Sequence, residues 1–578
     1  MIRLQDCFKG YTTDQDKAVT PEQTVASVKA CMAEACAGVL QETDRVDTGR
    51  LGIPVFVSKC GPKAAEVMPT RKQMGKGASP EQAEASALME LVERFSYFTF
   101  WNTPSNFEEL TWSEAAERWP DELLPVSEII KSVGEIGLSE ADAVRLLDLV
   151  RWKFHPAHEI ATEKDVYVPL DWFKKLNEFN GSSAGNTFEE SILQGACELV
   201  ERHVCAVVDR TRPELPTIDP ASSDDPVLAR LVECFAKCGV KLVLKDFTLG
   251  FPVPTVAAVA WDPGTFPGLS EIVFTAGTSA TPEKAAVRAV TEVAQLAGDF
   301  ETSRVYEASG LPKFTQLEQI DWLRQGPTAS VGDLPDVEHQ NIRQELQSLA
   351  EGLKAMGYTL FSVDTTHPEL GVTANYNFVP GFLFRERTPH ASLGMFVGRI
   401  LAEEAEFDEA LIGLEVLAEV YPDAHFVPFF KGLLALRMDD VMFAADRFAE
   451  AEPLQPAPEE AALCAFYQAY ALTLAEEWEE AVPHLERAIA HDAEVKEFFN
   501  LRGVCFFRQG DYEAAAADFQ ASLDIDSGNP EDLANLGLCH KFMGNKAEAV
   551  DYLDVALSMN PGLEWARAHY EELLAEQD

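Results

Sequence analysis

The sequence predicts two successive domains: an α+β domain of mixed sheets backed by helices over residues 1–390, and an all-α superhelix of repeats over residues 391–578. Two observations carry this prediction. Before about residue 390, short β-branched runs bounded by Gly, Pro or Asp alternate with amphipathic helical segments. After it the strands disappear, and small and apolar residues recur with a period near 34. The length of 578 residues also exceeds the roughly 250 to 300 at which a single core stops growing.

The first domain is expected to mix strands with longer helices. The runs IPVFVSK, VKLVLKDF, PTVAAVAWD and EIVFTAG predict strands near residues 53–59, 240–247, 254–262 and 271–277. Apolar residues at helical spacing predict helices near residues 21–40, 81–100, 188–207, 226–238 and 282–300. Residues 104–160 are interpreted as an insertion, and the polar, proline-bearing stretch 300–345 as a partly ordered excursion.

The second domain is predicted from its repeat. Alanines recur at intervals of 34, 37, 34 and 34, and each is followed four positions later by an apolar residue. The pairs are Ala410 and Leu414, Ala444 and Phe448, Ala481 and Leu485, Ala515 and Phe519, and Ala549 and Leu553. This pattern is typical of tetratricopeptide repeats, in which a small residue lets two antiparallel helices approach closely, and about five repeats are expected. Their concave surface is expected to hold a peptide or protein; buttressing of the first domain or dimerisation is the alternative.

The chain is strongly acidic, with 95 Asp and Glu against 47 Lys and Arg and a formal net charge of −48. Because nucleic acids and anionic membranes are themselves negative, we expect a basic protein as partner instead. We find no signal peptide and no apolar run of membrane length, so we expect a cytoplasmic protein. The 11 cysteines lack zinc-site spacing and predict reduced, packed thiols.

Three helical segments place charged and amide side chains on one face among apolar residues. These polar side chains are Ser86, Glu90 and Glu93 in the first segment, Glu190, Gln194, Glu198, Glu201 and Arg202 in the second, and Arg288, Glu292 and Gln295 in the third. Carboxylates in largely buried helices repel one another and need a compensating cation, and carboxylate oxygens suit Mg²⁺ that holds a polyphosphate. The alternative is a solvated charged face, which is how most charge runs are read. The apolar flanks favour the buried interpretation.

Together these segments resemble the YcaO family, whose members use ATP to phosphorylate a backbone amide oxygen. The resemblance covers most of residues 1–390 and runs through four motifs in the family's order. They are Ser86 with Glu90 and Glu93, the segment Ser183–His203, the segment Phe274–Gln295, and Val363–Val372 with Val379–Gly381, which looks like the family's closing strands. The resemblance therefore implies a catalytic domain that binds ATP and Mg²⁺ and releases ADP and phosphate.

The resemblance also implies roles for individual residues. It implies metal-binding carboxylates at five positions: Glu90, Glu93, Glu198, Glu201 and Glu292. It implies nucleotide contacts at seven: Lys17 and Thr24 toward the phosphates, Ser86 and Gln194 beside the nucleotide, Arg210 on the phosphate side, and Arg288 and Gln295 in the third segment. No catalytic base is identified. His203 and His367 lie nearest the motifs, but a lone histidine is more often structural.

The sequence does not specify the client. Family members that make azolines usually end in a Pro-x-Pro-x-Pro tail, whereas this chain ends in EELLAEQD after helical repeats. The architecture resembles stand-alone bacterial members, one of which is an accessory factor in β-methylthiolation of an aspartate on a small-subunit ribosomal protein. We therefore expect amide activation on a basic protein, with a methylthiotransferase or sulfur-delivery partner. Backbone thioamide or azoline synthesis, and a nucleotide-regulated scaffold that recruits a methylthiotransferase, are the alternatives; a homodimer is left open.

Overall fold

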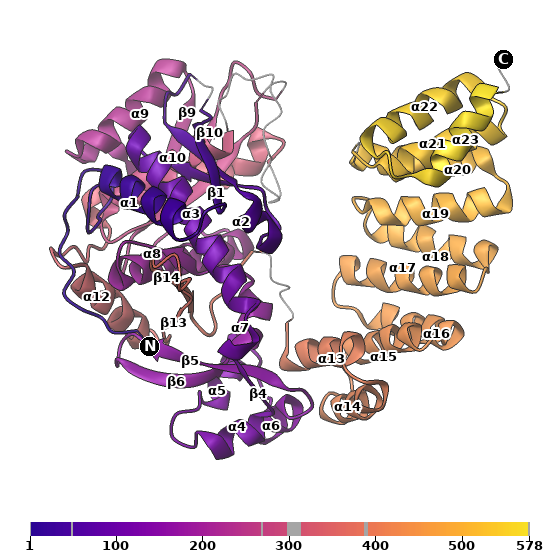
Figure 1. Cartoon of the computed structure of the whole chain (residues 1–578), viewed down its shortest axis with the longest axis horizontal. Helices are drawn as coiled ribbons and strands as arrows, with labels where there is room; N and C mark the ends of the chain where they lie inside the picture. Colours follow the sequence, from indigo (N-terminus) through magenta and orange to yellow (C-terminus); the bar gives the residue numbers. More distant parts are fainter. Residues whose placement is uncertain are drawn as a thin grey trace. The chain divides into compact units, whose positions relative to one another are not determined.

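The chain folds into two compact units. The computed structural model describes residues 2–47, 50–267, 270–297, 314–385, 391–526 and 528–575. The first unit comprises Met1–Gly137 and Arg151–Pro389, and the second comprises Leu138–Val150 and His390–Asp578. The described strands form three separate sheets in the first unit, and the second unit is helical (Figure 1). Within the described ranges, no helix is both long and apolar enough to cross a bilayer.

The first sheet is an antiparallel meander near the start of the chain. Its strands, in order, are β1 (Leu40–Arg45), β2 (Val55–Cys60) and β3 (Lys72–Lys76). Helix α3 (Pro80–Trp101) packs on β2 and β3, and α1 (Pro21–Glu34) and α2 (Pro62–Val67) pack on α3. Leu88, Leu91 and Val92 of α3 are completely buried in this layer. The apolar spacing of α3 therefore leaves its remaining face free for polar side chains.

The second sheet has five strands and separates two hydrophobic cores. Its order is β11 (Val273–Thr278), β10 (Thr255–Trp261), β9 (Lys241–Asp246), β8 (Thr217–Asp219) and β12 (Thr328–Ser330), and only the β8–β12 pair among these is parallel. Alternate residues of β10 enter opposite cores. Ala257 and Val259 lie in one core, and Val256 and Ala258 lie in the other. Helices α9 (Pro226–Cys238) and α10 (Pro282–Ala297) cover one face. The continuous apolar run of β10 follows from this burial on both sides.

The third sheet collects strands from distant parts of the sequence. Its order is β4 (Glu108–Leu110), β5 (Trp152–Glu159), β13 (Phe361–Asp364), β14 (Ala374–Phe378) and β7 (Ser182–Ala184), and β6 (Lys164–Pro169) also pairs with β5. Helix α7 (Leu170–Asn177) packs on β5, and α8 (Phe188–Thr211) packs on β7 and β14. The shorter helices of this unit are α4 (Trp112–Arg118), α5 (Val126–Ser132) and α11 (Asp321–Arg324).

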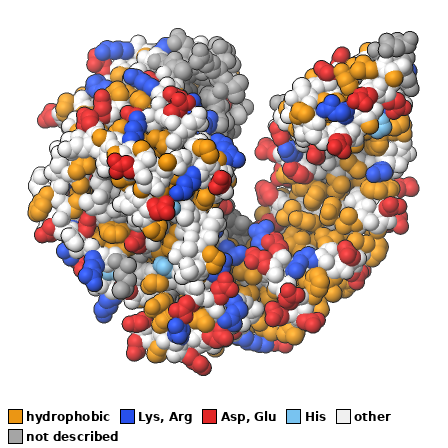
Figure 2. All heavy atoms as spheres, in the orientation of Figure 1, with side chains coloured by type: hydrophobic (Ala, Val, Ile, Leu, Met, Phe, Trp, Pro, Cys, Tyr) orange, Lys and Arg blue, Asp and Glu red, His pale blue; other side chains and the backbone are white. Residues whose placement is uncertain are grey.

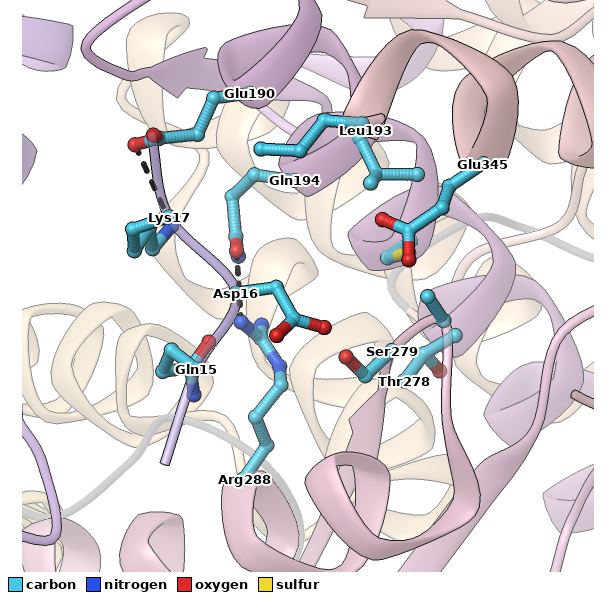
Figure 3. A pocket seen from close by; sticks show the side chains of 13 residues that line it. Gln15, Asp16, Lys17, Glu190, Leu193, Gln194, Thr278, Ser279, Arg288 and Glu345 are labelled. Atoms are coloured by element: carbon cyan, nitrogen blue, oxygen red, sulfur yellow. Dashed lines mark hydrogen bonds and ion pairs between the residues drawn. The ribbon is translucent and has the colours of Figure 1, made fainter. Parts of the chain in front are cut away.

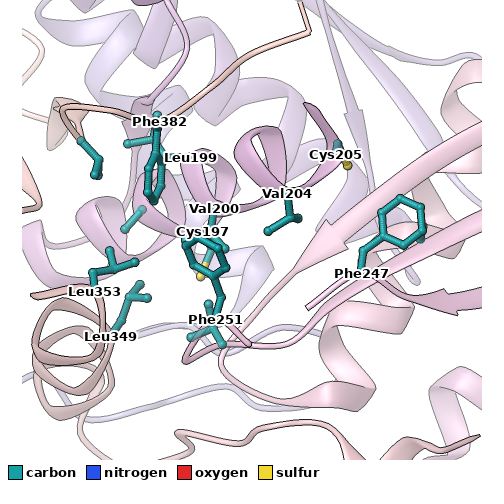
Figure 4. Close-up of a cluster of buried hydrophobic side chains, with 14 of the residues drawn as sticks. Cys197, Leu199, Val200, Val204, Cys205, Phe247, Phe251, Leu349, Leu353 and Phe382 are labelled. Atoms are coloured by element: carbon teal, nitrogen blue, oxygen red, sulfur yellow. The ribbon is translucent and has the colours of Figure 1, made fainter. Parts of the chain in front are cut away.

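The buried side of α8 anchors the largest core of the first unit. Figure 4 shows Leu349 and Leu353 of α12 (Ile342–Ala355) and the ring of Phe251 lying against Val200 of α8. These side chains belong to one cluster of buried residues, and α12 contacts α8 directly. The packing of its apolar face thus holds α8 in place. Charged side chains on the opposite face of α8 therefore have defined positions.

The second unit is a solenoid of helix pairs. Its helices are α6 (Glu140–Leu147), α13 (Leu393–Glu403), α14 (Phe407–Val420), α15 (Phe426–Arg437), α16 (Val441–Ala451), α17 (Pro458–Leu474), α18 (Trp478–His491), α19 (Lys496–Gln509), α20 (Tyr512–Ile525), α21 (Pro530–Phe542), α22 (Lys546–Met559) and α23 (Glu564–Ala575). The five repeat alanines are completely buried. A Cβ on Gly432 would lie 2.8 Å from the Phe448 ring, and one on Gly503 would lie 3.1 Å from Phe519. The predicted helical repeat is confirmed, with small residues on one helix facing large ones on the next.

Several connections differ from the sequence prediction. The helix predicted over 21–40 ends at Glu34, and Leu40 already belongs to β1. Residues 104–160 are not an insertion, because β4 and β5 join the third sheet and residues 138–150 join the solenoid. The described part of the 300–345 stretch is ordered and supplies β12; residues 298–313 lie outside the described residues. The closing motif Val363–Val372 is mainly the connection between β13 and β14, and Val379–Gly381 follows β14.

Removing α6 is expected to destabilise the solenoid. Ala143, Leu146 and Leu147 of α6 are completely buried, and α6 contacts α13 and α14. A fragment of residues 391–575 would expose the surface they cover and lose roughly 3 kcal/mol or more of unfolding free energy. Urea unfolding followed by circular dichroism tests this, with a synthetic peptide of residues 138–150 added back to the fragment. Equal midpoints with and without the peptide would show that α6 does not support the solenoid.

Candidate functional site

Each of the three sheets ends in an edge strand that leads into a long helix. Strand β3 leads into α3, β7 into α8, and β11 into α10. The three strand–helix units also interlock in a cyclic order, since α3 contacts β7, α8 contacts β11, and α10 contacts β3. A cavity of about 320 Å³ is lined by residues of all three helices and by the amino-terminal segment.

The three helices repeat one local pattern. Ser79, Thr187 and Thr281 precede them, and each hydroxyl accepts a hydrogen bond from the backbone amide three residues on. Side chains seven, eleven and fourteen residues after each of these caps share one helix face. They are Ser86, Glu90 and Glu93 in α3, Gln194, Glu198 and Glu201 in α8, and Arg288, Glu292 and Gln295 in α10. All nine line the cavity, so the pattern itself brings the predicted residues together.

Glycines set how closely each helix lies on its strand. A Cβ on Gly75 of β3 would come within 2.0 Å of the Ala87 amide nitrogen, and one on Gly277 of β11 within 2.5 Å of the Ala289 nitrogen. In the α8 unit the glycine lies on the helix instead of on the strand. A Cβ on Gly195 of α8 would come within 2.7 Å of the Ser183 hydroxyl on β7. Only a residue without a side chain fits one partner of each contact. The depth of each carboxylate-bearing helix follows from these contacts.

The cavity mixes charges of both signs. Its acidic side chains are Glu90, Glu93, Glu190, Glu198, Glu201 and Glu292, and its basic ones are Lys17, Lys76, Arg94, Arg202 and Arg288. Lys76 forms an ion pair with Glu292, Arg94 lies 3.3 Å from a Glu93 oxygen, and Arg202 lies 3.4 Å from a Glu198 oxygen. The carboxylates are therefore offset by neighbouring cations. The sequence argument from unrelieved repulsion overlooked Lys76 and Arg94.

Burial acts against the charged forms of these groups. It raises the pKa of Glu93 well above its ordinary value, although Arg94 opposes the shift, and it raises the pKa of Glu90 and Glu201 as well. Burial, with a contribution from Arg288, lowers the pKa of Lys76 to about 8. Carboxylates and amine are thus held in a setting that favours their neutral forms. A ligand that carries both negative and positive charge would relieve this cost.

The amino-terminal segment closes one side of the cavity. Glu190 accepts hydrogen bonds from the Ala18 amide at 2.9 Å and from the Asn186 side chain at 2.9 Å, and its carboxylate lies 3.7 Å from the Lys17 nitrogen. The Thr24 hydroxyl donates to Asn186 at 3.1 Å. Lys17 and Thr24 are therefore brought to the site through Glu190 and Asn186. The sequence reasoning placed Glu190 in the acidic row of its helix without this role, and it missed Asn186.

A buried charge network anchors residues 9–17, which we call the clasp. Within it, Tyr11 and Lys17 pair in an antiparallel bridge. Lys9 lies 2.7 Å from Glu345 and 3.0 Å from Asp16, and Asp16 also pairs with Lys284 of α10 at 2.5 Å. Figure 3 shows Asp16 and Glu345 beside a second cavity of about 30 Å³, next to the Gln194–Arg288 hydrogen bond of 2.8 Å. The clasp thus fixes Lys17 between α8 and α10.

One predicted nucleotide residue is not brought to this cavity. Arg210 is exposed on α8, more than two turns beyond Glu201, and donates a hydrogen bond to the Phe384 carbonyl at 3.2 Å. His203 and His367 do not line the cavity either; His203 stacks on Phe382, and His367 stacks on Phe95. The other eleven predicted site residues all line it.

A sequence signal could have revealed the missed lysine. The pattern Gly-x-x-Ala-Ser/Thr-Pro-Glu occurs at Gly75–Glu81 and again at Gly277–Glu283, each time at the turn into a site helix. Lys76 is the second residue of the first copy. The repeat predicts that both turns have the same conformation and that residue 76 belongs to the site. In the structure α10 packs on β3, which ends at Lys76. Asn186 carries no comparable signal, because only tertiary contacts bring it to the clasp.

The side chains fit a magnesium–nucleotide complex better than a bare metal ion. In the part of the chain that the structure describes, no group of three or more His, Cys, Asp or Glu side chains is arranged to hold a metal by itself. Mg²⁺ usually takes one or two carboxylates and completes its shell with phosphate oxygens and water. Basic side chains such as Arg288 and Lys17 provide the complementary contacts for phosphates. The site is therefore of the kind found in proteins that bind a metal–nucleotide complex.

Comparison with known proteins agrees with this class. A family model described as YcaO cyclodehydratase, ATP- and Mg²⁺-binding, matches residues 74–383, and the chain belongs to this family. Two tetratricopeptide-repeat models match residues 468–530 and 506–576. The family resemblance and the cofactors ATP and Mg²⁺ expected from the sequence are confirmed.

Individual relatives show how far the likeness extends. An uncharacterised protein of Methanothermobacter thermautotrophicus is 28% identical over 63% of this chain and 94% of its own length. The ribosomal protein S12 methylthiotransferase accessory factor YcaO of Escherichia coli is 27% identical over 33% of this chain and 35% of its own. Among solved structures, a heterocyclase in complex with substrate and cofactor matches with a TM-score of 0.52 and 22% identity, over 66% of this chain and 54% of that one. At this identity the structural match concerns the fold.

Proposed function

We propose that this protein uses ATP and Mg²⁺ to activate a backbone amide of a protein or peptide client by phosphorylating its oxygen. The observation that carries the proposal is the convergence of three capped helices on one cavity that pairs six glutamates with five basic side chains. In this reaction the amide oxygen bonds to the γ-phosphorus as ADP leaves, and a nucleophile then adds to the amide carbon as phosphate departs. Such transfers depend mainly on positioning and charge neutralisation.

The residues divide between two proposed tasks. Glu90, Glu198 and Glu292, the equivalent residues of the three helices, together with Glu93 and Glu201, would hold Mg²⁺. Lys17, Thr24, Ser86, Gln194, Arg288 and Gln295 would contact the nucleotide; Arg210 stays a prediction from the family resemblance. Lys76 and Arg94 neutralise carboxylates in the absence of ligand. We propose that they turn toward phosphate oxygens once Mg²⁺ takes their place beside the carboxylates.

The client we propose is a basic protein. The name of the Escherichia coli relative supports a role as accessory factor in methylthiolation of a small-subunit ribosomal protein. The net charge of −48 supports it independently, because complementary charge speeds the encounter with a basic client. The tetratricopeptide repeats provide the surface for a protein partner. Backbone thioamide formation on another client uses the same first step and is distinguished by the product.

Client-dependent phosphate release tests amide activation. The whole chain is incubated with Mg²⁺, ATP and small-subunit ribosomal proteins prepared from cells that lack the gene. We expect phosphate release to rise at least about tenfold over the basal rate, and a client labelled with ¹⁸O in its backbone carbonyls to pass the label to phosphate, because the activated oxygen leaves with it. Nucleotide binding without client-stimulated release or label transfer would instead support the scaffold interpretation.

A further inference from the structure

Helix α17 presents an uncharged, apolar face to solvent in an otherwise acidic unit. From Ala461 to Ala475 it contains no charged residue. Leu463, Tyr470 and Leu474 are 41, 38 and 51% exposed, and their spacing of seven and four residues places them on one side of the helix. Figure 2 shows hydrophobic side chains gathered over the middle helices of the solenoid. Single exposed apolar residues are ordinary, but a stripe along one helix is typical of an interaction surface.

The stripe rests on a rigid aromatic layer. Phe466 of α17 stacks with Tyr470 at 6.4 Å between ring centroids and contacts Phe498 of α19 at 5.2 Å. Tyr467 contacts Phe429 of α15 at 5.6 Å and Phe448 of α16 at 5.3 Å. Because these rings are wedged between neighbouring helices, the stripe is already in place before a partner arrives. We call Leu463, Tyr470 and Leu474 the α17 stripe.

Glutamates flank the stripe at both ends. Glu459 and Glu460 precede it, and Glu476, Glu477, Glu479 and Glu480 follow it. None of the six forms an ion pair with a residue that the structure describes. Glu459 and Glu460, at the start of α17, interact favourably with its helix dipole. Negative charge just after the end of a helix interacts unfavourably with that dipole. Of the four that follow, Glu479 and Glu480 lie in the first turn of α18 and Glu477 at its N-cap position, where negative charge favours the dipole of that helix. Glu476 is the one whose position does not serve the stability of either helix.

The backbone at Glu476 supports this conclusion. Its φ of +62° is a left-handed conformation that favours glycine, and Gly510 and Gly544 occupy the equivalent position in the next two repeats, at +84° and +86°. A glutamate at this position is strained, and its charge opposes the helix dipole. Both costs are explained if the carboxylate meets a positive charge on a partner.

We propose that the α17 stripe binds an amphipathic helix of a partner protein, whose apolar side is bracketed at both ends by Lys or Arg. The 17 residues of α17 span about 25 Å, so the two basic ends of the partner should lie about that far apart. A second copy of this chain does not fit this description, because its net charge is −48 and its own stripe is flanked by glutamates. The inference rests on the solenoid alone and goes beyond amide activation, because it requires neither ATP nor the first unit.

A designed peptide tests the surface in the whole protein. The probe is a fluorescein-labelled amphipathic helix about 25 Å long, with leucines along one face, uncharged polar residues along the opposite face and two lysines at each end. Fluorescence anisotropy should show saturable binding that weakens about tenfold in Leu474→Ser and in Leu463→Ser, the loss expected for burial of one leucine. The matched controls are Ile412→Ser and Met559→Ser, which remove exposed apolar residues elsewhere in the unit and should bind the peptide normally.

A second variant separates recognition from stability. Glu476→Gly should weaken peptide binding about twofold to fivefold, as for an exposed charge pair, yet raise the unfolding midpoint because glycine relieves the left-handed backbone. A merely structural glutamate would not produce these opposite effects. Three results would overturn the proposal. A peptide with glutamates in place of its lysines could bind as tightly as the probe, or both stripe variants could bind the probe as tightly as the wild-type chain. The third is a dimer, seen in sedimentation and abolished by Leu474→Ser, which would assign the face to self-association.

Discussion

Glu201→Gln is expected to reduce ATP turnover about a hundredfold, which corresponds to about 2.7 kcal/mol of transition-state stabilisation. Glu201 accepts a hydrogen bond from the Thr278 amide at 3.0 Å, and glutamine keeps an acceptor at this place, so the fold should persist. The variant removes one charge from the proposed metal position. Glu90→Gln is expected to behave in the same way. Steady-state phosphate release with saturating Mg²⁺ and client provides the measurement.

The same substitutions should stabilise the ligand-free protein. Burial raises the pKa of Glu90 and Glu201 above that of an unfolded chain, so their ionisation at neutral pH favours the unfolded state. Removing the charge should therefore raise the unfolding midpoint, by about 2 to 4 °C for each kcal/mol gained. A variant that loses activity because it unfolds would instead show a lower midpoint. Loss of stability together with activity would contradict a ligand-binding role for these carboxylates.

Lys9→Met is expected to lower the free energy of unfolding by about 3 to 5 kcal/mol, the cost of leaving a buried charge without its partner. The side chains of Lys9 and Glu345 are both completely buried, and the Lys9 nitrogen lies 2.7 Å from a Glu345 oxygen. Because Lys9 anchors the clasp, its loss should also increase hydrogen exchange in residues 9–17 and raise the KM for ATP, since Lys17 is held less firmly. Chemical denaturation and exchange measured by mass spectrometry test both effects.

The effect of Lys9→Met should depend on pH. Burial raises the pKa of Glu345, and Lys9 opposes the shift, so the variant should raise this pKa further. A folded-state pKa above the unfolded value means that stability falls as pH rises through this window. The deficit of the variant should therefore be larger at pH 8 than at pH 5. Lys237→Met is the matched control, because it breaks an exposed pair with Glu233 and should change the stability little at either pH. Equal losses in the two variants would show that the clasp network does not hold the fold.

Elements with local signals were predictable from the sequence. The helix predicted over 226–238 has these bounds in the structure, because Asp225 caps it, Pro226 starts it and Gly239 ends it. The solenoid was predictable for the same reason, since its small and large residues recur in a fixed phase. Strand β1 was missed because its sequence, LQETDR, has little strand preference and becomes a strand by pairing with β2. The place of α6 in the solenoid likewise depends on tertiary contacts alone.

The candidate site shows the same division. Helical spacing placed Glu90 with Glu93 and Glu198 with Glu201 correctly on shared faces. It could not show that Lys76, from a strand, pairs with Glu292 of α10, because that contact depends on how β3 packs against α10. The prediction of strong mutual repulsion was therefore incomplete. The internal cations also change the chemistry of the cavity, since they make it suitable for phosphates as well as for a metal ion.

Titration calorimetry with a nonhydrolysable ATP analogue, with and without Mg²⁺, tests the central claim most directly. The wild-type chain should bind the analogue tightly only with Mg²⁺. Glu201→Gln and Glu90→Gln should weaken this Mg²⁺-dependent binding about tenfold or more, which corresponds to about 1.4 kcal/mol. Glu233→Gln, an exposed glutamate of α9 outside the cavity, should bind normally. Unchanged Mg²⁺-dependent affinity in both site variants would contradict the assignment of this cavity as the nucleotide site.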